Sequence, residues 1–226
     1  MKITFLGHAC LSIEIADCTI LIDPFITANE KAKGIVDIQE LNPNYILLTH
    51  AHQDHILDVE SIAKRVNATI VSNYEIAMHY QAKGFLVHPM NHGGNWIFDF
   101  GKVKYTNAIH TSSFPDGTYG GQPGGFIIEA NGKTIYIAGD TALTMDMKLI
   151  PMQYNLDLAV LPIGDNFTMG IEDAVIAADF LSCKNVLGYH FDTFGFIEIN
   201  HEQAIERFKV GGKELHLLDI GGSLEI

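Results

Sequence analysis

The chain has 226 residues, of which 47% are hydrophobic and 18% charged, and its formal net charge is −13. This composition predicts a folded protein with a sizeable core, and no apolar run is long enough to cross a membrane. The acidic balance disfavours nucleic acid as a partner, because binding to a phosphate backbone needs clustered Lys and Arg.

The N-terminal residues lack the long apolar region of a signal peptide. The three cysteines, Cys10, Cys18 and Cys183, are an odd number and form no C-x-x-C pair. Such usage argues against a disulfide framework. We therefore expect three packing residues and a protein of the reducing cytoplasm.

The first half of the chain predicts short strands, turns and two helices. Apolar and polar residues alternate over 11–16, as in a half-buried strand, whereas apolar residues recur at helical spacing over 56–66. Residues 24–35 are expected to form a loop. The remaining elements are strands at 2–6, 18–23, 45–49, 68–71, 86–87 and 95–100, and a helix at 73–82.

The second half begins with an alternating strand at 102–109, and a Gly-, Ser- and Pro-rich loop follows over 111–125. A connection of this length indicates a functional rim. Asn131-Gly132 predicts a tight hairpin. The remaining elements are strands at 126–129, 134–138, 156–161, 185–189 and 214–218, helices at 145–150, 172–182 and 201–209, and a C-terminal tail.

A weak repeat relates the two halves. Predicted strands end at His8, Asp23 and His50 in the first half, and at His110, Asp140 and Asp165 in the second. We interpret this as one domain, 1–226, built from two similar β-rich halves of about 1–100 and 101–226. Two such halves would pack sheet on sheet, with helices outside.

The most informative stretch is Thr49-His50-Ala51-His52-Gln53-Asp54-His55, directly after an apolar strand. His50 and His52 are two residues apart, so in an extended segment their side chains point the same way and can meet one cation. Asp54 and His55 point elsewhere once the chain turns into a helix, and suit a second cation. Imidazole and carboxylate ligands favour zinc, manganese, iron or nickel.

Three further polar side chains follow predicted strands. His110, Asp140 and His190 can converge with the heptad at one edge of the sheets. The combined set offers seven ligands, more than one cation needs. We therefore predict two cations, with Asp140 as the bridging carboxylate.

This pattern resembles the metallo-β-lactamase superfamily over nearly the whole chain. Other stretches are similar to its small metal-dependent hydrolases and, more distantly, to ascorbate-6-phosphate lactonase. They are 7–10, 21–24, 120–125, 161–164, 167–170 and 190–194.

The resemblance implies a four-layer αββα sandwich of the α/β class (α+β by some schemes). It implies that His50, His52 and His110 hold one metal, that Asp54, His55 and His190 hold the other, and that Asp140 bridges them. Two divalent ions are expected, zinc foremost, with manganese, nickel or iron as alternatives.

The implied activity is hydrolysis of an ester, lactone or phosphodiester bond in a small substrate by a bridging hydroxide. Asp54 would orient this nucleophile or take its proton. A nuclease acting on nucleic acid and a metal-binding protein without turnover are the alternatives, although the basic arm of the RNA-processing relatives is absent. No membrane partner is expected, and a homo-oligomer is left open.

His8 is the second candidate catalytic residue, facing substrate or lying behind a metal ligand; a structural histidine is the alternative. Asp23 is expected to accept a hydrogen bond from a ligand imidazole, or to cap a turn. The glycines of 120–125 suit a mobile flap or an anion cradle. We expect no functional role for His79, His88, His92, His201 and His216.

Overall fold

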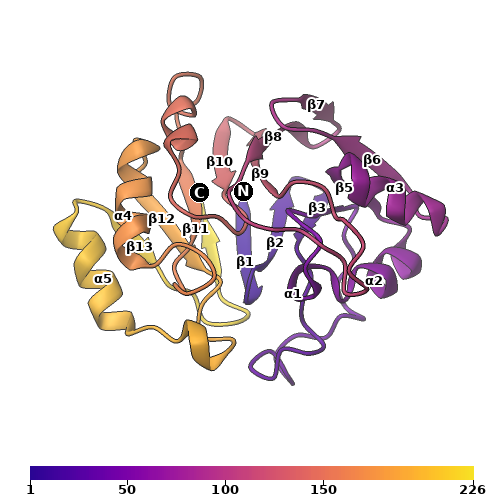
Figure 1. The fold of residues 1–226 in the computed structure, drawn as a ribbon, viewed down its shortest axis with the longest axis horizontal. Helices are drawn as coiled ribbons and strands as arrows, with labels where there is room; N and C mark the ends of the chain where they lie inside the picture. Colours follow the sequence, from indigo (N-terminus) through magenta and orange to yellow (C-terminus); the bar gives the residue numbers. More distant parts are fainter.

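A computed structural model describes all 226 residues, and its elements form four layers (Figure 1). Two seven-stranded sheets face each other at the centre, and helices cover the outer face of each sheet. This arrangement confirms the expected αββα sandwich. None of the helices is both long enough and apolar enough to span a membrane.

The strand order is β14-β1-β2-β3-β4-β5-β6 in the first sheet and β13-β12-β11-β10-β9-β8-β7 in the second. The first sheet contains β1 (Lys2–Gly7), β2 (Cys10–Ile15), β3 (Cys18–Ile22), β4 (Tyr45–Leu47), β5 (Thr69–Asn73), β6 (Val87–Met90) and β14 (Ser223–Glu225). The second contains β7 (Asn95–Phe98), β8 (Gly101–Asn107), β9 (Gly124–Ala130), β10 (Lys133–Ile137), β11 (Leu158–Pro162), β12 (Asn185–Tyr189) and β13 (Glu214–His216). The helices are α1 (Gln53–Ile56), α2 (Val59–Val66), α3 (Tyr74–Ala82), α4 (Ile171–Phe180), α5 (His201–Val210) and the 3₁₀ helices η1 (Met145–Leu149) and η2 (Gly195–Ile197).

The two sheets repeat one pattern of strand directions. β1 and β3 are antiparallel to β2 between them, and β3 to β6 run parallel. In the second sheet β8 and β10 flank the antiparallel β9, and β10 to β13 run parallel. Every strand that precedes a predicted site residue therefore ends at the same edge of its sheet.

Three hydrophobic clusters separate the four layers. The largest lies between the sheets and includes Ile13, Phe126 and Leu187. A second packs α4 and α5 on the second sheet through residues such as Phe208. A third packs α2 and α3 on the first sheet through residues such as Ile62. The helices are thus fixed by their apolar faces, which leaves the strand ends free to carry polar side chains.

The predicted helix over 56–66 is wrong as a single element. The structure has a one-turn helix, α1, and a separate helix, α2. The break falls beside Asp58, which is 3% exposed and whose carboxylate accepts hydrogen bonds from the backbone of Ile26 and Thr27 and from the Thr27 hydroxyl. These long-range bonds hold the chain in a turn that the apolar periodicity does not reveal.

The predicted C-terminal tail is also wrong, because its last residues form β14 on the edge of the first sheet. Ile3 pairs with Leu224, and the N-terminal amino group donates to the Ile226 carbonyl. The two termini consequently lie side by side (Figure 1). β7 (Asn95–Phe98) precedes the division expected near residue 100, yet it belongs to the second sheet. Each sheet thus gains one edge strand from the other half of the sequence.

Matched isoleucine truncations test the core between the sheets. Ile128 on β9 is fully buried there, whereas Ile97 on β7 is 75% exposed. We expect Ile128→Ala to lower the free energy of unfolding by about 2–5 kcal/mol through lost burial and a residual cavity. Ile97→Ala should change it by less than about 0.5 kcal/mol. Urea unfolding of both variants measures the difference, and equal losses would contradict the described packing.

Candidate metal centre

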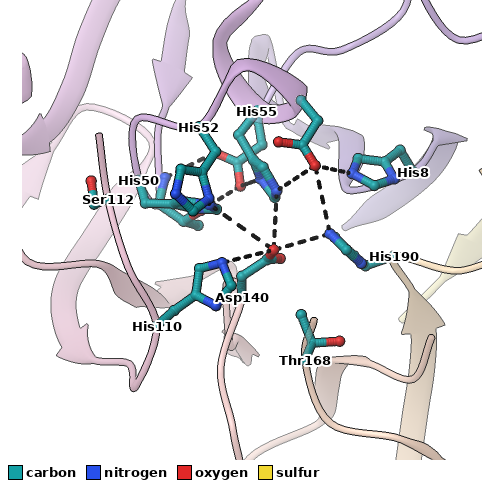
Figure 2. Close-up of polar contacts among 12 residues, drawn as sticks. His8, His50, His52, His55, His110, Ser112, Asp140, Thr168 and His190 are labelled. Atoms are coloured by element: carbon teal, nitrogen blue, oxygen red, sulfur yellow. Dashed lines mark hydrogen bonds and ion pairs between the residues drawn. The ribbon is translucent and has the colours of Figure 1, made fainter. Parts of the chain in front are cut away.

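The predicted ligands lie together at the edge where the two sheets meet, as Figure 2 shows for the histidines and Asp140. Asp54 joins them through its contacts with His55 and His190. His50 and His52 occupy the turn between β4 and α1, and Asp54 and His55 lie in α1 itself. The second sheet contributes the remaining three, each from the loop after a strand: His110 after β8, Asp140 after β10 and His190 after β12.

The first group of potential ligands consists of His50, His52 and His110. Their ligand atoms all lie within 4.8 Å of one another. The closest pair is Nε2 of His50 and Nδ1 of His52, 2.9 Å apart. One ion can therefore contact nitrogens from both halves of the chain.

The second group consists of Asp54, His55, His190 and His8, whose ligand atoms also lie within 4.8 Å of one another. Asp54 Oδ2 is 3.9 Å from Nε2 of His55 and 4.0 Å from Nε2 of His190. Asp54 exposes 30% of its side chain, and it is the most accessible carboxylate of the cluster. It is thus the carboxylate best placed to reach a bound molecule.

Asp140 occupies the middle of the cluster, between the two groups (Figure 2). Its Oδ2 atom lies 3.0 Å from His190 Nε2 and 3.3 Å from His55 Nε2. The same oxygen lies 3.6 Å from His110 Nε2 and 4.0 Å from His50 Nε2. A single carboxylate oxygen therefore faces imidazoles of both groups.

Several buried polar atoms of the cluster have no hydrogen-bond partner. They are Nε2 of His55, both ring nitrogens of His190 and Oδ1 of Asp140. Buried nitrogen and oxygen atoms are almost always satisfied in folded proteins, so unsatisfied ones that converge indicate a missing partner. Imidazole nitrogen and carboxylate oxygen suit a divalent transition-metal ion. The residues present therefore fit metal ions.

The charges of the cluster are strongly coupled. Burial raises the pKa of Asp140, but the imidazoles of His190 and His55 outweigh this effect and hold it well below its ordinary value. Burial lowers the pKa of His55, but Asp140, Asp54 and Asp23 outweigh it and raise that pKa well above its ordinary value. Burial, with repulsion from His55, lowers the pKa of His50. The carboxylates and imidazoles thus shift one another's pKa in opposite directions.

Asp23 holds His55 from behind, as expected. Its Oδ2 lies 2.9 Å from His55 Nδ1 and also accepts from the Thr49 hydroxyl, while Oδ1 accepts from the Thr49 backbone N–H. Because a carboxylate accepts, the ring proton of His55 is on Nδ1, and Nε2 is left facing the cluster. Asp23 therefore contacts a candidate ligand imidazole as well as the Thr49 turn, whereas the alternative was a turn cap alone.

His8 is enclosed on all sides. Its side chain is 0% exposed, and its ring packs 4.1 Å from the His190 ring and 5.4 Å from the Phe25 ring. Nε2 lies 3.1 Å from Asp54 Oδ2, and Nδ1 lies 2.9 Å from the Thr193 hydroxyl. Burial, followed by repulsion from His190, lowers the pKa of His8 to about 4. The neutral ring therefore donates to Asp54 and accepts from Thr193.

Backbone conformations with positive φ are concentrated around the cluster. His8, Asp23 and His190 have φ values of 55°, 42° and 55°. Non-glycine residues seldom adopt this region, and they keep it only where surrounding contacts impose it. At Gly139, with φ of 69°, an added Cβ would lie 2.4 Å from the Gly124 carbonyl oxygen. The turn that delivers Asp140 consequently requires glycine.

The Gly-rich loop over 120–125 is tied down rather than free. Asn73 donates to the carbonyls of Gly120 and Gln122, and Ser112 donates to Gly120. Ser112 Oγ also accepts from the backbone N–H of Ala51, between His50 and His52. The loop thus braces the metal-site turn, a role that the sequence did not suggest.

Three residues around the cluster, Asp58, Ser112 and Thr193, were not predicted to have a role. Thr193 contacts a residue 185 positions earlier in the chain, and Ser112 one 61 positions earlier. Only the tertiary structure brings such pairs together, and we find no local signal for them. The five histidines expected to have no function, His79, His88, His92, His201 and His216, lie outside every group of potential metal ligands.

The comparisons with known proteins agree with this geometry. The beta-lactamase superfamily domain matches residues 2–190. A UPF0173 metal-dependent hydrolase of Christiangramia forsetii is 68% identical over 226 residues, all of both chains. A second UPF0173 metal-dependent hydrolase, from Flavobacterium johnsoniae, is 67% identical over the same length.

A solved structure is also similar. Igni18, a metallo hydrolase of Ignicoccus hospitalis, superposes with a TM-score of 0.90 at 32% identity, covering 100% of this chain and 98% of its own. The chain is therefore a metal-dependent hydrolase of the metallo-β-lactamase superfamily. Within that superfamily it belongs to the UPF0173 metal-dependent hydrolases.

Replacing Asp23 tests the support behind His55. We expect Asp23→Asn to weaken metal affinity about 10–100-fold, because the ring loses the charged acceptor that fixes its orientation. Competition with a chelating dye measures the affinity. The exposed carboxylate Asp37, whose Oδ1 only accepts from the Gln39 N–H, supplies the matched control Asp37→Asn. Equal affinities of both variants would show that Asp23 does not support the site.

Proposed function

We propose that this protein hydrolyses an ester, lactone or phosphodiester bond of a small molecule at a centre of two divalent metal ions. The observation that carries the proposal is the position of Asp140 Oδ2, within 4.0 Å of imidazoles from both ligand groups. A carboxylate between two sets of nitrogens suits a bridge, which a single ion would not need.

The two ligand groups would divide as the sequence suggests. His50, His52 and His110 would hold one ion, and Asp54, His55 and His190 the other. When bound, such ions act as Lewis acids and lower the pKa of water from about 15.7 towards about 7. Zinc suits this donor set best, with manganese, nickel or iron as alternatives.

The chain's own residues provide orientation and proton transfer. Asp54 is 30% exposed at the opening of the cluster, so its free oxygen can orient an attacking water or accept the proton it loses. Asp140, at 3% exposed, is shielded from solvent and cannot serve that purpose. Asp54 is therefore the proposed general base.

His8 is proposed as a positioning residue that acts through Asp54, rather than as a group that touches substrate. Its buried ring donates to Asp54 Oδ2 and is itself fixed by Thr193. This contact holds one carboxylate oxygen and leaves the other to face the opening. The role follows from the complete burial of the His8 side chain.

We also propose the cytoplasm as the compartment and a small molecule as the substrate. Cys10, Cys18 and Cys183 are all free thiols, as expected of a reducing environment. Burial raises the pKa of Cys10 and Cys183, so they are packing residues rather than nucleophiles. The proposal also leaves room for assembly of several copies of this chain into a homo-oligomer.

Metal-loaded protein should hydrolyse members of a panel of esters, lactones, phosphodiesters and β-lactams. We expect His52→Ala to lower kcat/KM at least about 100-fold, because a ligand of the first group is lost. The matched control is His88→Ala. This variant should retain activity, because His88 packs against Trp96 and lies outside every group of potential metal ligands. Activity that survives in His52→Ala would contradict the two-metal mechanism.

The positioning role of His8 predicts a split between kinetic constants. His8→Ala should lower kcat about 10–100-fold with little change in KM, since Asp54 loses its orientation while substrate contacts stay. His8→Gln should recover part of kcat, because its amide N–H can also donate to Asp54. Metal content, measured by mass spectrometry, should stay unchanged in both. A large rise in KM instead would place His8 in contact with substrate.

A further inference from the structure

The seven segments that carry or flank the candidate ligands contain no Lys or Arg. These site segments are 7–10, 23–27, 49–58, 108–124, 138–146, 163–170 and 189–200. They contain nine Asp or Glu but no Lys or Arg, although the whole chain has 14 Lys and Arg. Lys and Arg side chains are common partners of phosphate and carboxylate groups in binding sites. This centre has no such side chain on any segment that forms it.

Three basic residues outside the site segments are engaged in other contacts. Lys148, just beyond one site segment, lies 4.2 Å over the Phe180 ring. Arg207 forms an ion pair with Glu172 at 2.8 Å, and Lys33 lies 3.5 Å from Glu30. Each of these three cations thus has a partner outside the metal centre.

The metal ions would not supply much surplus positive charge either. Three carboxylates, Asp23, Asp54 and Asp140, contact the ligand imidazoles or belong to the ligand set. Two further acids of the site segments, Asp165 and Glu198, line a cavity of about 930 Å³ beside the 163–170 loop. An anionic group approaching the centre would meet these like charges.

The same segments expose large apolar side chains. Phe167, Phe194 and Phe196 are 52%, 38% and 77% exposed, and the rings of Phe167 and Phe196 lie 6.3 Å apart. Phe194 lies 5.3 Å from the His8 ring, and Thr168, next to Phe167, lies below the ligand cluster in the view of Figure 2. After β8 of the same sheet, Ile109 adjoins His110 and is 52% exposed. Apolar surface gathered around a polar centre is typical of a ligand site.

We infer that the substrate is an uncharged carboxylic ester or lactone bearing an apolar group, and that anionic phosphodiesters and carboxylated esters are excluded. This inference rests on the proposed function and narrows it. The apolar group would lie against Phe167, Phe194 and Phe196. Hydrolysis then needs only water, which adds across the acyl–oxygen bond to give an acid and an alcohol.

Two esters with the same leaving group test the charge preference on metal-loaded protein. We expect kcat/KM for 4-nitrophenyl butyrate to exceed that for mono-4-nitrophenyl succinate at least about tenfold after correction for their rates in buffer. Bis(4-nitrophenyl) phosphate should be turned over more slowly than either. Equal or faster turnover of an anionic compound, abolished in His52→Ala, would overturn the substrate class while leaving the metal-dependent hydrolysis intact.

An engineered cation gives a matched comparison. Phe167→Lys should raise the succinate-to-butyrate ratio of kcat/KM about two- to fivefold by Coulombic attraction, and Phe167→Gln should not. Lys31→Ala, which removes an exposed cation from the adjoining loop, should leave the ratio unchanged. A fall of succinate turnover in Lys31→Ala would mean that this loop recruits an anion, contrary to the inference.

A binding measurement tests the same surface without turnover. In calorimetric titrations of metal-loaded protein, uncharged N-benzylacetamide should bind more tightly than hippurate, which has a carboxylate and similar size. Phe196→Ser should weaken N-benzylacetamide binding several-fold. Equal or tighter binding of hippurate, or undetectable binding of both compounds at millimolar concentration, would overturn the assigned substrate class. A failure of hydrolysis alone would instead count against the proposed function.

Discussion

The candidate site depends on the burial of one carboxylate, Asp140, among imidazoles contributed by both halves of the chain. A charge removed from water costs several kcal/mol unless partners compensate it. Here the partners are His190 at 3.0 Å, His55 at 3.3 Å and His110 at 3.6 Å. His55 comes from the first sheet and the other two from the second, so the compensation exists only when the sheets are docked. Metal ions bound by these residues would therefore couple metal binding to docking of the two sheets.

The surrounding hydrogen bonds show how this docking is secured. The His190 N–H donates to the His8 carbonyl, and Tyr105 donates its hydroxyl proton to the Thr49 carbonyl. The Gly124 N–H donates to the same Thr49 carbonyl. Each bond joins the two halves within a few residues of a candidate ligand. The inter-sheet core supplies the driving force for association, and these bonds set the alignment of the ligand-bearing loops.

Much of the architecture could be predicted from the sequence because its signals are local. Period-2 alternation, the Asn131-Gly132 turn and the histidine-rich heptad each depend on neighbouring residues, and β9 and β10 do form the expected hairpin. The proximity of the seven candidate ligands was also predictable, since strands that repeat in order bring their ends to one edge. His8, Asp23 and His50 have counterparts at strand ends in the second half. This repeat matches the strand order that the two sheets share.

What the sequence did not reveal depends on long-range contacts. The break between α1 and α2 is held by Asp58 bonds to residues about thirty positions earlier, and β14 forms only because β1 is free to pair with it. The bracing by Ser112 and the burial of His8 likewise require the folded structure. Local propensity carries no information on such partners, and tertiary packing overrides the periodicity over 56–66.

We propose that the two halves of the chain together hold two metal ions around Asp140. The equilibrium metal stoichiometry of the protein tests this most directly. Mass spectrometry of protein dialysed against zinc should find two ions per chain in the native protein. It should find one in His110→Ala and one in His190→Ala, because each variant loses a ligand of a different group. A native stoichiometry of one ion, or two ions retained in both variants, would contradict the dinuclear centre.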